Sequence, residues 1–254
     1  MSRRPSYLVL SAVAWLAFGA VVVWSMAFLA GVVVSPTVDG PARASTAVAV
    51  LVDLSLLLLF AVQHSVMARR PVKAWLARRI PAPLERTTYV LAANACLALV
   101  FSLWQPFGPQ VWSVHGPGAT VLWVVYAAGW VLAVASTFAV DHLELVGLRQ
   151  AGWGARRDAI TELETGGLYA VVRHPLMTGL LVAFWATPQM GASHLLFALA
   201  STGYVAVGVA FEERDLRRTF GPAYGEYAAR VPAVVPGLTV VRRGRAAVPP
   251  YLRP

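Results

Sequence analysis

Residues 176–211 read LMTGLLVAFWATPQMGASHLLFALASTGYVAVGVAF and contain no Asp, Glu, Lys or Arg. As one helix, these 36 residues would extend about 54 Å, well beyond the roughly 30 Å hydrocarbon core of a bilayer. The run is interrupted at 188–191 by Pro, Gln, Met and Gly, and both Pro and Gly disfavour a helix interior. The stretch therefore predicts a tight hairpin of two membrane-crossing helices.

Four further apolar runs lie upstream of this hairpin, and each is long enough to cross a bilayer. They cover residues 7–34, 46–68, 88–104 and 119–140. Over the whole chain 58% of the residues are hydrophobic and only 13% are charged, against roughly a quarter charged in a soluble domain. We therefore expect an all-α integral membrane protein with about six transmembrane helices.

The distribution of positive charge predicts how these helices are oriented. With the N-terminus in the cytoplasm, the cytoplasmic connections hold 20 of the 21 Lys and Arg residues, and the opposite side holds only Arg43. Cytoplasmic loops carry an excess of Lys and Arg, so we expect a protein of the cell's inner or plasma membrane with both termini cytoplasmic. The same pattern accounts for the net charge of +9, and nucleic acid is not expected as a partner.

Metal and disulfide chemistry are not indicated by the sequence. Cys96 is the only cysteine and lies within an apolar run. The five histidines are scattered and do not show the spacing of a metal site. We therefore expect neither a bound metal nor a disulfide framework.

Ionisable residues from four helices are predicted at one depth, near the cytoplasmic face. They are His64, Asp141, His142, Arg173, His174, Glu212 and Glu213. Any one of them could simply be an interfacial residue, but carboxylates and imidazoles at membrane depth are costly and tend to mark functional sites. Asp53, His115 and His194 fall near the opposite face, where we expect structural polar contacts.

Two strings within this group suggest a ligand. In RHPLMTG at 173–179, Pro175 fits the first turn of a helix, which places Arg173 and His174 beside unpaired backbone N–H groups. A ligand carboxylate would suit that position. The string EERDLRRTFGPAYGEYAARVP at 212–232 adds carboxylates and aromatic faces that a ribose and an adenine could use. The residues alone describe a nucleotide-like or zwitterionic ligand at the membrane surface.

The paired strings also carry a resemblance to a known family. RHPxxxG at the head of a helical hairpin, followed by EExxLxxxFGxxYxxYxxxVP, resembles the isoprenylcysteine carboxyl methyltransferase superfamily of membrane methyltransferases over about 166–236. QHSVMAR at 63–69, DHLELVGLRQ at 141–150 and FWATP at 184–188 extend the likeness to about 60–236 and are most similar to the branch that methylates methanethiol. Met177 departs from the pattern, because many relatives have Tyr there.

The resemblance implies an enzyme that takes its methyl group from S-adenosylmethionine and converts methanethiol to dimethyl sulfide. The residues that would contact this donor are Arg173, His174, Pro175, Gly179, Glu212, Glu213, Tyr224 and, as a weaker candidate, Gln150. The donor site would then belong to a C-terminal part, 141–254, made of a cytoplasmic loop, the hairpin and the last segment. An N-terminal part, 1–140, would supply the other transmembrane helices.

Methylation of a thiol also requires removal of its proton. A thiol with a pKa near 8.5 is only a few per cent ionised at pH 7. We therefore expect Arg149 to supply positive potential, and Asp141 with His142, or else His64, to take the proton. An Asp141–Arg149 ion pair that only holds the loop is the structural alternative.

Two other functions stay open at this point. The chain could methylate an isoprenoid carboxylate or another lipid-soluble nucleophile, or it could be a non-enzymatic transporter or assembly protein. A small closed pocket would favour a thiol, a lateral opening to lipid would favour an isoprenoid, and donor binding would exclude a non-enzymatic role. The expected partners are a small volatile thiol and the lipid bilayer.

Overall fold

The computed structural model describes residues 5–154 and 163–237, and these residues form an almost entirely helical protein. Five helices in this part of the chain are long and apolar enough to cross a membrane. They are α1 (Pro5–Ala30), α2 (Thr46–Met67), α4 (Glu85–Leu103), α5 (Pro117–Val140) and α8 (Ala192–Phe220). The expectation of an all-α integral membrane protein is confirmed, and the first four predicted runs match α1, α2, α4 and α5 within a few residues.

The predicted hairpin is present, but its first arm is short. Helix α7 (Pro175–Trp185) has 11 residues, so it is about 16 Å long, roughly half the hydrocarbon thickness. It ends before Pro188, and residues Gln189–Gly191 form strand β2, which pairs antiparallel with strand β1 (Gln110–Ser113). The described residues thus contain five helices of crossing length and one short apolar helix. The sequence predicted two slightly short helices for the hairpin, whereas only α7 is short and α8 has 29 residues.

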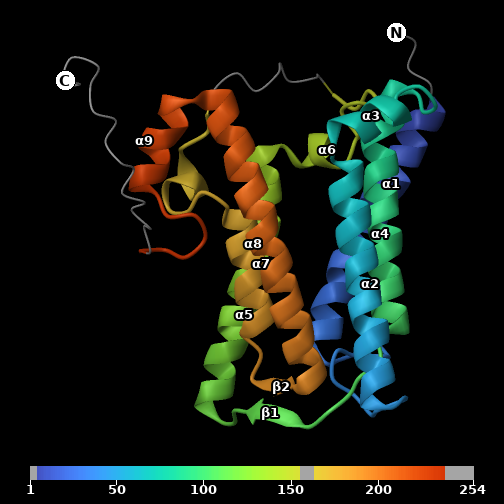
Figure 1. Cartoon of the computed structure of the whole chain (residues 1–254), viewed down its shortest axis with the longest axis vertical. Coiled ribbons are helices and arrows are strands. Elements are labelled where there is room, and N and C mark those ends of the chain that lie inside the picture. The colour runs from blue at the N-terminus through green and yellow to red at the C-terminus, as the bar shows by residue number, and fades with distance from the viewer. Residues whose placement is uncertain (1–4, 155–162, 238–254) are drawn as a thin grey trace, which may run out of the picture.

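The long helices form two groups. Figure 1 shows α1, α2 and α4 on one side and α5, α7 and α8 on the other, with β1 and β2 at one end of the bundle. The short helices α3 (Arg70–Leu76), α6 (His142–Leu145) and α9 (Pro222–Arg230) lie at the opposite end. Two 3-10 turns, η1 (Ala82–Leu84) and η2 (Gly167–Ala170), complete the described elements. Helix α5 belongs to the predicted N-terminal part, 1–140, and α7 to the predicted C-terminal part, 141–254. Because α5 packs along α7, these two parts are in direct contact.

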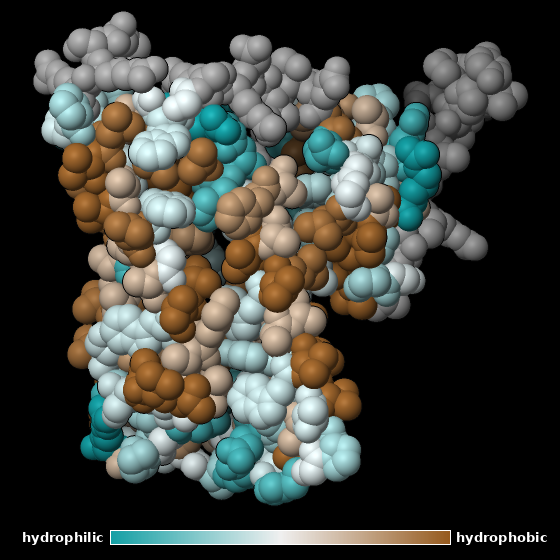
Figure 2. Space-filling view, turned by 180° about the vertical axis from the view of Figure 1, so that it is seen from behind, coloured by the Kyte–Doolittle hydropathy of each residue, from teal (hydrophilic) through white to brown (hydrophobic). Residues whose placement is uncertain are grey.

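An aromatic core joins the two groups near the β1–β2 end. Phe28 of α1 lies 4.9 Å from the ring of Phe101 and 6.0 Å from that of Phe197, and Phe197 contacts Phe184 of α7 at 5.3 Å. Trp104 closes the cluster and donates its indole N–H to Val38 O at 3.0 Å. Many other apolar side chains face outward along the helices (Figure 2), as a lipid environment requires.

The α5–α7 interface depends on two glycines. A Cβ atom at Gly179 would lie 2.5 Å from Ala133 N and 2.6 Å from Gly129 O, and one at Gly129 would lie 2.8 Å from Gly179 O. Small residues let membrane helices approach closely enough for their backbones to touch. The structure therefore gives Gly179, a residue predicted at the donor site, a packing role between two helices.

Candidate functional site

The start of α7 is held by residues 231–234, which we call the C-terminal clamp. Arg173 N donates to Pro232 O at 2.9 Å, and His174 N donates to Ala233 O at 3.0 Å. One turn later, Thr178 Oγ1 donates to Val234 O at 2.7 Å. These bonds satisfy N–H groups at the helix start that have no partner within α7 itself. The clamp thus explains why the two strings found in the sequence occur as a pair.

The guanidinium group of Arg173 joins three elements. Its Nε donates to Glu213 Oε1 of α8 at 2.8 Å, and its Nη2 pairs with the same carboxylate. Its Nη1 donates to Ala228 O of α9 at 3.1 Å and also to Val231 O of the clamp. Because both side chains are largely buried, this arginine organises the region.

His174 lies between two carboxylates. Its Nδ1 is 3.3 Å from Glu212 Oε2, and its Nε2 is 3.5 Å from Glu213 Oε1. The imidazole is only 3% exposed, whereas the Glu212 side chain is 53% exposed. Burial alone would lower the pKa of His174, but the two carboxylates outweigh burial and raise its pKa to about 9. His174 is therefore an imidazolium at neutral pH.

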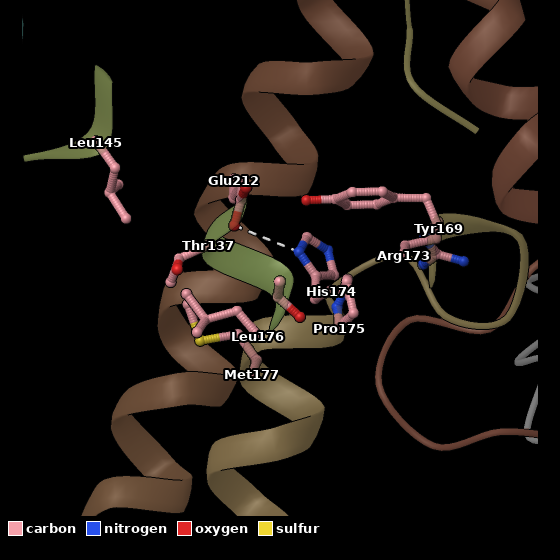
Figure 3. Close-up of a pocket in the computed structure, with 10 residues that line it drawn as sticks. Thr137, Leu145, Tyr169, Arg173, His174, Pro175, Leu176, Met177 and Glu212 are labelled. Atoms are coloured by element: carbon pink, nitrogen blue, oxygen red, sulfur yellow. Dashed lines mark ion pairs between the residues drawn. The ribbon is translucent and has the colours of Figure 1, made fainter. Parts of the chain in front are cut away.

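A cavity of about 130 Å³ lies beside this pair. Its wall is built by Ser136, Thr137, Leu145, Tyr169, Arg173, His174, Pro175, Leu176, Met177 and Glu212. Figure 3 shows Glu212 and His174 facing each other, with the Tyr169 hydroxyl directed towards Glu212 and with Leu176 and Met177 on the other side. The cavity thus has one charged wall and one largely apolar wall.

Only part of the predicted donor set reaches this cavity. Arg173, His174, Pro175 and Glu212 line it, and Glu213 stands directly behind them. Tyr224 is buried in α9, with its ring 5.9 Å from that of Tyr227. Gln150 donates to Glu144 O at 3.3 Å in the turn after α6.

Asp141 and Arg149 form an ion pair. Such a pair was the contact expected if these residues hold the loop and take no part in catalysis. Asp141 has a φ of 91° and caps α6 by accepting from Leu143 N at 3.1 Å and from Glu144 N at 3.2 Å. A carboxylate at a helix N-terminus is favourable for that helix. Both residues thus have a clear role in shaping the turn between α5 and α6.

His142 is held by both of its ring nitrogens. Trp15 of α1 donates its indole N–H to Nε2 at 2.7 Å, and Nδ1 lies 2.9 Å from Thr137 Oγ1. Phe138 stacks on the imidazole with a centroid distance of 4.4 Å. Burial lowers the pKa of His142, and nearby Asp141 offsets part of that effect.

His64 is a residue of α2, and its side chain faces α4. Its Nε2 is 2.9 Å from the Tyr89 hydroxyl, and its ring packs against Phe60 at 5.2 Å. Its Nδ1 is buried and has no hydrogen-bond partner among the described residues. None of the four predicted catalytic residues, Asp141, His142, Arg149 and His64, is part of the cavity wall.

Three polar residues of the cavity wall were not predicted from the sequence. Tyr169 lies in η2, four residues before Arg173, and its carbonyl accepts from the Tyr227 hydroxyl at 2.7 Å. Ser136 and Thr137 lie in the last turns of α5. The signal that could have found them was two neighbouring hydroxyls close to the end of the apolar run 119–140.

At the other end of the bundle, polar residues make structural contacts, as expected for Asp53 and His194. Asp53 accepts from Gln105 N at 2.9 Å, and His194 Nε2 lies 3.0 Å from Phe184 O. Asp39 accepts from Gly191 N at 2.6 Å and from His194 N at 3.1 Å. Asp39 therefore ties the α1–α2 loop to β2 and to the start of α8.

Comparison with known proteins agrees with this architecture. The family model described as "NnrU protein" matches residues 53–240. A Bradyrhizobium diazoefficiens protein named methanethiol S-methyltransferase 2 is 44% identical over 245 residues, which cover 96% of this chain and 95% of that protein. A Mycobacterium tuberculosis protein named methanethiol S-methyltransferase is 43% identical over 237 residues, which cover 92% of this chain and 97% of that protein. No solved structure matches the chain. The chain therefore belongs to the NnrU protein family, together with these methyltransferases that it matches along nearly its whole length.

Proposed function

We propose that this membrane protein transfers a methyl group from S-adenosylmethionine to methanethiol and so forms dimethyl sulfide. The observation that carries the proposal is the cavity that joins the His174–Glu212 pair to an apolar wall. The names of the relatives, which match over more than nine tenths of the chain, point to the same reaction.

The charges around His174 fit the zwitterionic end of the donor. The His174 imidazolium lies between Glu212 and Glu213. Its buried Nε2 is 3.5 Å from Glu213 Oε1 but makes no hydrogen bond among the described residues, so this N–H can still donate to a ligand carboxylate. Glu212 is half exposed and suits an ammonium or sulfonium group. The donor supplies an electrophilic methyl group when it is bound. We assign binding of its amino-acid end to His174 and Glu212, and assign to Arg173 and Glu213 the support of that pair.

The size of the cavity favours a small acceptor. Its volume of about 130 Å³ is below the roughly 300–1,000 Å³ of sites that enclose drug-sized ligands. An alkyl thiol of two heavy atoms fits wholly within such a space, whereas an isoprenoid chain would extend beyond it. Most of the donor would lie outside the cavity, beside the exposed face of Glu212. This size argument favours a thiol over the isoprenoid carboxylate that the sequence left open.

The protein contributes mainly by holding the acceptor sulfur in line with the transferred methyl group. Such positioning can contribute about 7–11 kcal/mol to catalysis. As the new S–C bond forms, the sulfonium C–S bond breaks, and the thiol proton must leave. Asp141 with His142, or His64, remains the proposed proton acceptor, with Arg149 as the nearby cation. His64 Nδ1 has no hydrogen-bond partner within the described part of the chain, whereas the Nε2 lone pair of His142 already accepts from Trp15, and this difference favours His64.

We place the cavity on the cytoplasmic side of the membrane, with both termini on that side. Support comes from the basic residues around α3, at the same end of the bundle as α6 and α9 (Figure 1). Arg43 is the one Lys or Arg in the α1–α2 loop, which lies at the other end with β1 and β2. The charge count also includes Arg3, Arg4 and arginines at 156, 157 and beyond 237, which lie outside the described residues.

Purified protein in detergent, mixed with S-adenosylmethionine and methanethiol, tests the proposal directly. Headspace gas chromatography should detect dimethyl sulfide, and calorimetry should detect donor binding that His174→Gln weakens. Thr202→Val, on α8 and outside the cavity wall, serves as the matched control and should behave as wild type. Donor binding without dimethyl sulfide, together with methylation of a prenylated cysteine, would establish the isoprenoid alternative. Absence of donor binding would support a non-enzymatic role.

A further inference from the structure

A chain of hydrogen bonds leads from α1 to the cavity, and its direction is fixed by chemistry. Trp15 Nε1 donates to His142 Nε2 at 2.7 Å. An indole nitrogen can only donate, so Nε2 must be the nitrogen that carries the lone pair. In a neutral imidazole the hydrogen then sits on Nδ1, which lies 2.9 Å from Thr137 Oγ1. His142 therefore donates to Thr137.

The hydroxyl of Thr137 donates its own hydrogen bond to the backbone of its own helix, α5. Thr137 Oγ1 donates to Val134 O at 2.8 Å. The oxygen therefore uses its only hydrogen and one lone pair, and one lone pair remains. Thr137 is largely buried and is one of the residues that line the cavity. Any hydrogen bond between this oxygen and a ligand in the cavity must therefore use the remaining lone pair, with the oxygen as acceptor.

The neighbouring hydroxyl on the cavity wall follows the same rule. Ser136 Oγ donates to Leu132 O at 2.6 Å, so its hydrogen is also taken up within α5. The α5 side of the cavity thus presents oxygen lone pairs, and Leu176 and Met177 provide apolar surface. A carboxylate has no hydrogen to donate to such a wall and would face oxygen lone pairs. A small molecule with one donor hydrogen on an apolar body fits it.

We propose that the α5 side of this cavity is the acceptor subsite, where a small alkyl thiol donates its S–H to Thr137 Oγ1. His142 and Trp15 are positioning residues that hold this oxygen in its acceptor state. As the thiol sulfur bonds to the methyl group, it loses electron density and its hydrogen becomes more positive. An acceptor oxygen therefore stabilises the transition state more than the bound thiol. The subsite rests on the proposed function, and it leaves His64 as the proton acceptor, because both ring nitrogens of His142 are committed to Trp15 and Thr137.

The test compares three variants of the chain with two matched controls. Thr137→Val removes the oxygen and keeps the shape, Thr137→Ser keeps the oxygen, and Trp15→Phe removes the N–H donor without touching the cavity wall. Elsewhere in the protein, Trp185 Nε1 donates to Thr202 Oγ1 at 3.0 Å, and Thr202 donates to Ala198 O at 2.6 Å. Thr202→Val and Trp185→Phe therefore break an equivalent chain that does not reach the cavity.

Dimethyl sulfide formation and donor affinity are measured for each variant. Thr137→Val should lower kcat/KM for methanethiol about three- to tenfold, on the scale of one lost hydrogen bond, with the donor Kd within about twofold of wild type. Thr137→Ser should recover most of this loss, and Trp15→Phe should lower kcat/KM by a smaller factor. In spectra of protein labelled with ¹⁵N-histidine, His142 Nε2 should appear unprotonated in wild type and become partly protonated in Trp15→Phe. Both controls should match wild type.

The outcomes separate the subsite from the proposed function. Wild-type activity with an unchanged kcat/KM in Thr137→Val overturns the subsite alone. An equal loss of donor affinity in Thr137→Val also overturns it, because the oxygen would then serve the donor. Absence of turnover by the wild-type protein overturns the proposed function and the subsite together. If Thr137→Val does not fold, Trp15→Phe decides, and wild-type kinetics with an unshifted His142 spectrum overturn the proposal.

Discussion

Arg173 and Glu213 lie 40 positions apart in the sequence, yet Arg173 Nε donates to Glu213 Oε1 at 2.8 Å. This contact joins a residue two positions before α7 to the last third of α8. Glu212, the neighbour of Glu213, turns instead to His174 and is far more exposed. We therefore propose different tasks for these two adjacent carboxylates, Glu213 in holding the structure and Glu212 in binding.

Glu213→Gln and Glu212→Gln should consequently fail in different ways. Removing one partner of a largely buried ion pair leaves an uncompensated charge, so Glu213→Gln should lower the free energy of unfolding by about 3 kcal/mol. Glu212→Gln should cost less stability, because Glu212 is half exposed although it helps to hold the charge of His174, and it should weaken S-adenosylmethionine binding. Thermal unfolding and calorimetry in detergent distinguish the two effects. Equal loss of stability in both variants would contradict this division of tasks.

The raised pKa of His174 predicts a stability that depends on pH. Its pKa rises from 6.5 to about 9 in the folded protein, because Glu212 and Glu213 favour the imidazolium. The resulting stabilisation is fully present below pH 6.5 and is lost as the pH rises through about 9. The unfolding temperature of wild type should therefore fall between pH 7 and 10 by more than that of His174→Gln. Parallel curves for the two proteins would show that His174 is not charged in the folded state.

The glycine contact between α5 and α7 predicts a steric effect. Gly179→Ala places a methyl group 2.5 Å from Ala133 N, where only backbone lies in its way. The two helices must move apart, and we expect a clear drop in the unfolding temperature. Gly203→Ala on α8 is the control, since a Cβ there meets nothing within 4 Å and Ala favours helix by up to about 1 kcal/mol. A harmless Gly179→Ala would mean that the helices are not in backbone contact.

Proton removal can be tested by pH rescue. General-base assistance is typically worth about 10²- to 10⁴-fold, so loss of the base should reduce turnover on that scale at pH 7. Higher pH supplies thiolate from solution and should restore part of the rate in a variant that lacks the base. Asp141→Asn, Arg149→Gln and His64→Ala should be compared across pH 7 to 10. Rescue confined to His64→Ala identifies His64 as the base, whereas no rescue in any variant leaves the Asp141–Arg149 pair as a loop contact only.

The proposed orientation can be tested with reporter fusions. Fusions after residues 40, 112 and 190 all fall at the β1–β2 end of the bundle. Each should therefore report the external side of the membrane. A cytoplasmic signal from the fusion at 190 would show that the α7–α8 hairpin does not reach the far side.

Apolar runs were sufficient to predict most of the fold. Runs at 46–68 and 119–140 correspond closely to α2 and α5, because bilayer thickness imposes a minimum length that composition reveals. The short length of α7 could not be predicted in this way. It follows from the pairing of β2 with β1, two strands about 80 residues apart, and pairing of distant segments leaves no periodic signal in either one.

The site was predicted less completely than the fold. Arg173, His174 and Glu212 were predicted together, and they meet, since each carries a charge at one predicted depth. Thr137 was missed because a hydroxyl inside an apolar helix usually bonds its own backbone, and only the contacts with His142 and the cavity give it another role. For Gly179 the family resemblance implied a ligand contact. In the structure this residue lacks a side chain because the backbone of α5 lies directly against it.

The C-terminal clamp also bears on truncation of the chain. Residues 231–234 follow α7 and α8 in the chain, so the clamp lies beyond the second arm of the hairpin that it fastens. In a chain that lacks these residues Arg173 can still pair with Glu213, but the carbonyl groups of Ala228, Val231 and Pro232 that complete its surroundings are missing. A chain truncated before residue 228 should therefore keep both arms of the hairpin in the membrane and lack a complete site.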